Sequence, residues 1–160
     1  MSTVLESKVP LELRFNTTLL TAAFFILTLV IMFSPHLLGS NLFFGIQLIL
    51  SIPLIATSSL VRVKIISEQE SSVLYSFGHL VFVLGYATLI NSLGLLLSMT
   101  TLPFIGTLFL LANIFMALIY SLMLIIEGKE AFVKRAVKDL LFCSLIIFLG
   151  ILPMYYHFLI

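Results

Sequence analysis

The sequence has little charge. Asp, Glu, Lys and Arg make up 9% of its 160 residues, against about 25% in an ordinary soluble domain. The formal net charge is +1, so the chain has no basic field of the kind that holds nucleic acid. Apolar residues reach 61%, and one small domain cannot bury that much apolar surface in water. The composition therefore excludes a water-soluble fold, argues against a nucleic-acid partner, and predicts an integral membrane protein in contact with the lipid bilayer.

Cysteine and tryptophan are also scarce. The single cysteine, Cys143, cannot form a disulfide within the chain, and its neighbours Phe142 and Ser144 do not provide the electropositive surroundings that activate a thiol. Because tryptophan is absent, tyrosine must supply the aromatic rings that favour membrane interfaces. Nucleotide-binding, zinc-protease and calcium-binding motifs are missing as well. We therefore expect no cofactor and no metal site.

The charges that are present fall into three clusters, at 6–14, 62–70 and 127–139. The stretches 15–61, 71–126 and 140–160 contain no Asp, Glu, Lys or Arg. One bilayer crossing takes about 20 apolar residues, so the first two stretches each hold two crossings and the last holds one. Since backbone groups inside the bilayer must be paired within the protein, the sequence predicts an all-α bundle of five transmembrane helices. We place these spans at about 16–33, 42–61, 72–99, 102–126 and 140–160.

The spans predict one transmembrane domain, 16–160, preceded by a cytoplasmic N-terminal tail, 1–15. Five crossings bring this tail, the connection between spans 2 and 3 and the connection between spans 4 and 5 to the same side. All eight Lys and Arg residues lie there. By the positive-inside rule that side is cytoplasmic, and the C-terminus lies on the opposite side. The membrane is then a bacterial or archaeal cytoplasmic membrane, or an organellar one.

Two polar segments border the spans. Residues 1–8 are expected to be loose, and 9–15 either lie along the interface or enter span 1 directly. In the connection between spans 4 and 5, Glu130 and Lys134, and likewise Arg135 and Asp139, are four residues apart, a spacing that supports a helix. This segment is predicted to be an interfacial helix, or else a cytoplasmic extension of span 5.

No carboxylate, lysine or arginine falls within the core of a predicted span. Proton relays, ion pathways and acid–base catalysis within the bilayer use such groups, so we expect that the protein is not an enzyme. His79 is the one ionisable candidate in a span core, on the same face as Tyr86. It is predicted to be a structural histidine; the alternative is a haem or metal ligand or a proton carrier. A ligand role would need a second ligand at matching depth, and His36 and His157 map to the opposite surface.

Small and polar residues in the spans are the remaining candidates. Gly78 and Gly85 lie seven residues apart in span 3, a spacing that lets another helix approach closely. Polar side chains at similar depth in four spans predict a central hydrogen-bonded layer, which either joins the helices or lines a pore. The layer comprises Thr28, Ser51, Tyr86, Thr88 and Asn113.

These observations favour a small polytopic membrane protein that acts as a non-catalytic subunit, or as a stabilising or regulatory partner, of a larger membrane complex. Its partners would be other membrane subunits or further copies of itself. The alternative is an oligomeric channel or carrier for an uncharged or hydrophobic solute or a lipid. Pro53 and Pro153, which should kink their helices, together with Asn113, support that alternative.

Overall fold

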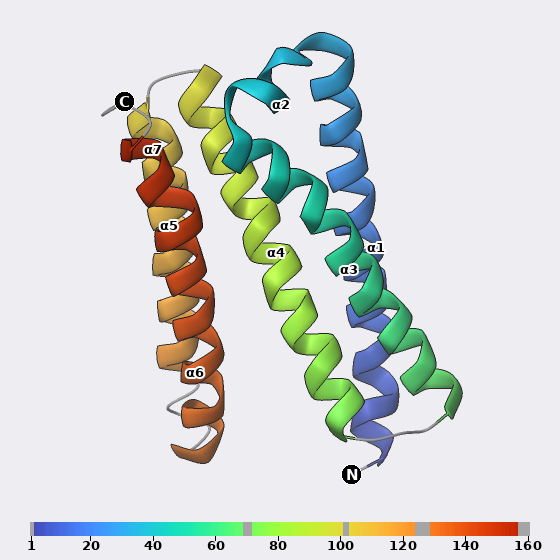
Figure 1. The fold of residues 1–160 in the computed structure, drawn as a ribbon. Coiled ribbons are helices and arrows are strands. Elements are labelled where there is room, and N and C mark those ends of the chain that lie inside the picture. The colour runs from blue at the N-terminus through green and yellow to red at the C-terminus, as the bar shows by residue number, and fades with distance from the viewer. Residues whose placement is uncertain (1, 69–71, 101–102, 124–128, 157–160) are drawn as a thin grey trace. The chain divides into compact units, whose positions relative to one another are not determined.

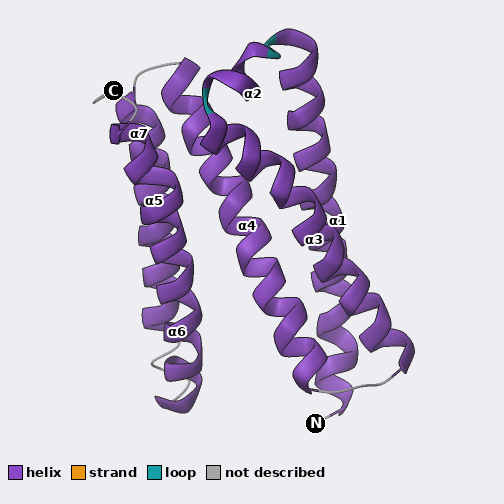
Figure 2. Ribbon diagram, in the orientation of Figure 1, coloured by secondary structure: helices purple, strands orange, loops and turns teal. Residues whose placement is uncertain are grey.

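The computed structural model describes residues 2–68, 72–100, 103–123 and 129–156. Within these ranges the backbone is helical apart from short turns, and no strand occurs (Figure 2). The elements are α1 (Ser2–Phe33), α2 (His36–Ser40), α3 (Leu42–Glu68), α4 (Ser72–Thr100), α5 (Pro103–Met123), α6 (Lys129–Ile146), the π-helical turn η2 (Ile147–Ile151) and α7 (Leu152–Tyr156).

The predicted all-α architecture is confirmed. Five helical segments are long and apolar enough to cross a membrane, so the chain is a polytopic integral membrane protein. That residues 16–160 form a single domain stays a prediction. The five segments are Pro10–Phe33, Leu42–Ile66, Val73–Met99, Phe104–Met123 and Ala136–Tyr155.

The helices extend beyond the apolar stretches that predicted them. α1 begins at Ser2, so the tail expected at 1–15 is helical from residue 2 and runs directly into span 1. α3 continues to Glu68, past the expected end of span 2 at Val61. Glu, Lys and Arg are good helix formers, so a charged residue ends the apolar run without ending the helix.

The connection between spans 4 and 5 is helical, as predicted, from Lys129 onward. α6 passes without a break through η2 into α7. This continuity fits the second of the two alternatives, an extension of span 5, and the cytoplasmic location of the extension stays a prediction. The predicted ends of spans 4 and 5, at 124–126 and 157–160, lie outside the described residues.

Contacts divide the chain into two compact units, Met1–Tyr86 and Ala87–Ile160. In the first unit α1 and α3 lie side by side, joined through α2 (Figure 1), and the first half of α4 completes the unit. The second unit contains the rest of α4 and the paired helices α5 and α6, continued by η2 and α7.

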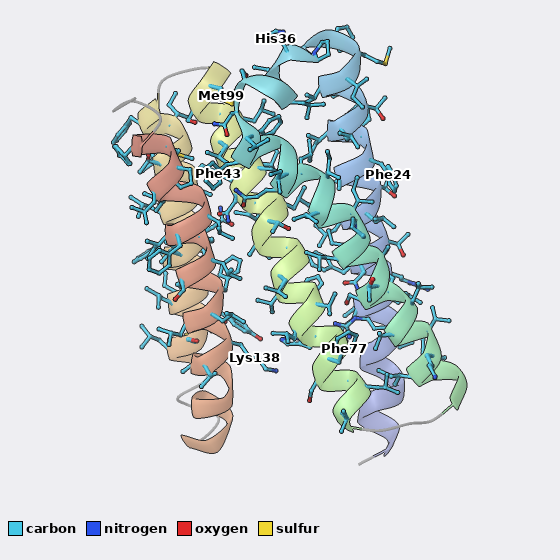
Figure 3. The ribbon with its side chains drawn as sticks, viewed as in Figure 1. Phe24, His36, Phe43, Phe77, Met99 and Lys138 are labelled. Atoms are coloured by element: carbon cyan, nitrogen blue, oxygen red, sulfur yellow. The ribbon has the colours of Figure 1, made fainter. Side chains whose placement is uncertain are left out.

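Each unit has a small interior and an apolar exterior. In the first unit the side chains of Phe44, Leu48 and Ile55 are completely buried. Large apolar side chains also cover the outside: Phe24 projects from α1 (Figure 3) and is 50% exposed. Exposed apolar side chains along whole helices are suited to a lipid environment.

Candidate functional site: a buried polar cluster of α1, α3 and α4

The most polar site in the first unit is an ion pair between α1 and α3. Arg62 Nη1 donates a hydrogen bond to Oε2 of Glu12. The Arg62 side chain is 3% exposed and that of Glu12 is 31% exposed. Both residues lie within segments apolar enough to span the membrane, a few residues from the segment ends. The Arg62 guanidinium is therefore buried, whereas the Glu12 carboxylate is partly exposed.

α4 supplies the other groups around this pair. Tyr75 Oη donates to Oε1 of Glu12 at 3.2 Å. The guanidinium carbon of Arg62 lies 6.0 Å from the centroid of the Tyr75 ring and 5.9 Å from that of Phe82, within range of cation–π attraction. Phe15 of α1 packs on Phe82 with ring centroids 6.0 Å apart. Three helices thus contribute to the enclosure of one charge.

Asn16 and Ser58 extend the cluster one helical turn inward. Only one orientation of the Asn16 amide satisfies both its ends: Oδ1 accepts from Arg62 Nε at 3.2 Å, and Nδ2 donates to the backbone carbonyl of Glu12 at 3.2 Å. Ser58 Oγ, 3.0 Å from the same end of the amide as Arg62, donates to the carbonyl of Gly78 at 2.9 Å. Asn16, Ser58 and Arg62 are all buried, so the network joins α1, α3 and α4 through hydrogen bonds.

The sequence prediction missed this cluster because it assigned Glu12 and Arg62 to cytoplasmic segments. The sequence nevertheless contains a pattern that points to the cluster. Glu12 and Asn16 are four residues apart, as are Ser58 and Arg62, so the two residues of each pair share a helix face. The spacing therefore places each of these charged residues beside a small polar one on the same helix face.

Gly78 and Gly85 lie where α4 approaches α3. A Cβ atom on Gly78 would come within 2.7 Å of Val61 Cγ1. A Cβ on Gly85 would meet Ile55 Cγ1 at 2.9 Å and Leu54 Cβ at 3.0 Å. Both glycines therefore permit a helix contact that any larger residue would push apart.

His79 and Tyr86 lie around Phe82 on α4. The His79 ring is 6.4 Å from that of Phe82, and Tyr86 stacks on Phe82 at 5.9 Å with an interplanar angle of 9°. His79 and Tyr86 are both half-buried. They belong to the aromatic group that borders the ion pair.

Three members of the predicted polar layer bond to their own helices. Thr28 Oγ1 donates to the Phe24 carbonyl at 2.8 Å, and Ser51 Oγ to the Leu48 carbonyl at 2.7 Å. Asn113 Nδ2 donates to the carbonyl of Phe109 at 2.9 Å. These three hydrogen bonds stay within single helices and do not join one helix to another.

In the second unit, Asn91 of α4 bonds to the last span. Its Nδ2 donates to the Leu145 carbonyl at 3.1 Å, and it is completely buried. A Cβ on Gly150, in η2, would lie 2.5 Å from Asn91 Oδ1, so the glycine makes room for the amide. Leu152 N–H donates to the Ile147 carbonyl, five residues back. This π-helical turn comes just before Pro153, whose ring would clash with the carbonyl four residues earlier in a regular helix.

A buried carboxylate, that of Asp139, lies near the start of the last span. Ser121 Oγ of α5 donates to Oδ2 of Asp139 in α6, and Asp139 is 5% exposed. The sequence prediction placed Asp139 in the cytoplasmic connection. It is instead the fourth residue of the apolar segment Ala136–Tyr155.

Among the described residues, no three His, Cys, Asp or Glu side chains come close enough together to hold a metal ion. No protein-family model, curated protein or solved structure matches the chain.

Proposed function

We propose that the protein is a non-catalytic subunit, or a stabilising or regulatory partner, of a larger membrane complex. One observation carries this proposal: the buried guanidinium of Arg62, in the apolar segment of α3, is paired with Glu12 and covered by Tyr75 and Phe82. A cation held in this way serves packing, because its hydrogen bonds and its aromatic contacts are made to neighbouring helices.

The outer surface supports the same proposal. α1 and α5 expose large apolar side chains along their length, including Phe25 at 62% and Phe115 at 63%. Such faces suit lipid or the helices of other membrane proteins. The parts of the chain outside the apolar segments are short, so recognition of partners would occur mainly within the membrane.

The test is affinity purification of the full chain from its native membrane in a mild detergent, followed by identification of the proteins that elute with it. The proposal predicts that one or more other membrane proteins elute in fixed stoichiometry. Elution of this chain alone, as a monomer or as an oligomer, would contradict it. A tagged membrane protein of similar size and unrelated sequence serves as the control for non-specific association.

The alternative, an oligomeric channel or carrier for an uncharged or hydrophobic solute or a lipid, is favoured by one feature of the second unit. Asn91 Oδ1 is buried without a hydrogen-bond partner among the described residues, beside a π-helical turn of the kind often found at functional sites. Solute flux in proteoliposomes of the purified chain that is lost in Asn91→Leu would support this alternative. The absence of flux for a panel of uncharged solutes, hydrophobic solutes and lipids would oppose it.

The charge distribution also supports an orientation. We propose that the N-terminus is cytoplasmic and the C-terminus lies on the opposite side, since all eight Lys and Arg residues then lie at cytoplasmic ends of helices.

A further inference from the structure

The exposed side of α1 carries a cation and four hydroxyl groups within the apolar segment Pro10–Phe33. Their spacing of three, four, seven and fourteen residues places them on one side of the helix. All five side chains are exposed. These residues, called the Arg14 face from here on, are Arg14, Thr17, Thr18, Thr21 and Thr28.

The opposite side of α1 packs inside the first unit. Asn16, Ala23 and Val30, which are spaced seven residues apart, are 1%, 0% and 6% exposed, and Asn16 bonds to residues of α3. Each of the three follows a member of the Arg14 face by two residues, which is about 200° around a helix. The Arg14 face is therefore turned away from the contact with α3.

α5 has a different exposed side. Its sequence contains no Asp, Glu, Lys or Arg, and its exposed side chains are apolar except for Tyr120. Thr107 and Ser121 are buried, and Asn113 is half-buried. Hydrocarbon offers polar groups no hydrogen-bond partner, so α5 has the arrangement that suits lipid, whereas the Arg14 face does not.

The Arg14 face has an unneutralised charge. Among the residues that the structure describes, the Arg14 guanidinium has no ion-pair or hydrogen-bond partner. Glu12, two residues earlier, is already paired with Arg62. Arg14 is the fifth residue of the apolar segment, about 6 Å along the helix from its first residue. A carboxylate is the partner that arginine binds most strongly, through two parallel hydrogen bonds.

The hydroxyl groups of the Arg14 face are available as acceptors. Each of the four threonines donates its O–H to the backbone carbonyl four residues earlier, at 2.8–3.0 Å. The hydroxyl oxygens can still accept hydrogen bonds. A row of acceptors thus extends from Arg14 to Thr28, over fourteen residues or about 21 Å of helix.

We propose that the Arg14 face binds a transmembrane helix of another protein, which presents a carboxylate level with Arg14 and hydrogen-bond donors along the threonines. The charge of Arg14 selects the carboxylate, and the length of the threonine row selects a helix. A lipid headgroup at one interface would meet Arg14 but would not reach Thr28. The inference rests on the proposed function, to which it adds the binding surface and the chemistry of the partner.

The first test is photo-cross-linking in native membranes, with benzoylphenylalanine in place of Thr21 in the full chain. We predict an adduct with one membrane protein, at a transmembrane helix that carries Asp or Glu level with Arg14. The same probe in place of Phe115, which is 63% exposed on α5, is the control and should not give this adduct. Adducts with lipid alone, with this chain itself, or with a helix that lacks such a carboxylate would overturn the inference.

The second test measures how much partner is recovered by affinity purification from the same membranes. Arg14→Gln is expected to lower the recovery roughly three- to thirty-fold, the range for polar contacts between membrane helices, and Thr21→Val to lower it less. Lys64→Gln and Thr57→Val are the matched controls, since both residues are exposed on α3. All four variants should melt like the wild type, and Arg14→Glu should regain binding when the partner's carboxylate is replaced by lysine.

The recovery also separates this inference from the proposed function. If the wild type brings down other membrane proteins and Arg14→Gln brings down the same amount, the inference is wrong and the proposed function stands. If the wild type brings down no other protein, both are wrong.

Discussion

At the scale of single residues, Arg62 shows how a charge is accommodated at the edge of an apolar helix. Its guanidinium is enclosed, so its energy depends on Glu12, on the Asn16 amide and on two aromatic rings. Taking away one partner of a buried pair leaves an uncompensated charge, which costs more than the pair contributes. The two partners are unequal, because Glu12 has access to its surroundings and Arg62 has almost none.

This inequality gives a prediction for two single variants. Glu12→Gln keeps the acceptor for Tyr75 but leaves Arg62 charged and buried, and is expected to destabilise the protein by about 3–5 kcal/mol. Arg62→Met keeps the apolar stem beneath the rings and leaves Glu12 ionised but partly exposed, and should cost less. Thermal unfolding in detergent measures both. An Arg62→Met variant less stable than Glu12→Gln would contradict the account.

At the scale of elements, the contact of α3 with α4 depends on Gly85. A methyl group there would lie 3.1 Å from the backbone nitrogen of Ile55 and close to the side chains of Leu54 and Ile55. A shift of the α3 backbone would be needed to relieve these contacts, and such a shift costs free energy. Gly85→Ala is therefore expected to destabilise the protein by about 1–3 kcal/mol. Gly39→Ala is the control, because a Cβ at Gly39 meets nothing within 4 Å. Equal melting temperatures for the two variants would show that α3 and α4 are not in close contact at Gly85.

The elements also show what the sequence could and could not predict. The five spans follow from hydropathy, which is a local property of each segment. The Glu12–Arg62 pair could not be predicted in this way, since its partners are 50 residues apart and charge was read as a sign of an aqueous segment. Pro153 predicts a disturbed helix, but neither the π-helical form of the disturbance nor the approach of Gly150 to Asn91 can be predicted from local sequence, because Asn91 lies on another helix.

At the scale of the whole molecule, the orientation of the spans makes a direct prediction. With Cys143→Ser as background, Ser2→Cys should react with a membrane-impermeant maleimide only from the cytoplasmic side. Ser40→Cys, at the exposed end of α2, should react only from the opposite side. Labelling of intact cells and of inverted vesicles measures both positions, and the reversed pattern would contradict the proposed orientation.

The central claim is that the Glu12–Arg62 pair holds α1, α3 and α4 together, and we propose that the pair takes no part in transport or catalysis. The double variant Glu12→Gln/Arg62→Met tests it most directly, through both its melting temperature and the proteins that co-purify with it. We predict that it melts above Glu12→Gln alone and retains the same partners in the same stoichiometry as the wild type. A double variant that melts like the wild type but loses those partners would contradict the claim. The two charged side chains would then be needed for binding to other proteins and not for the stability of the fold.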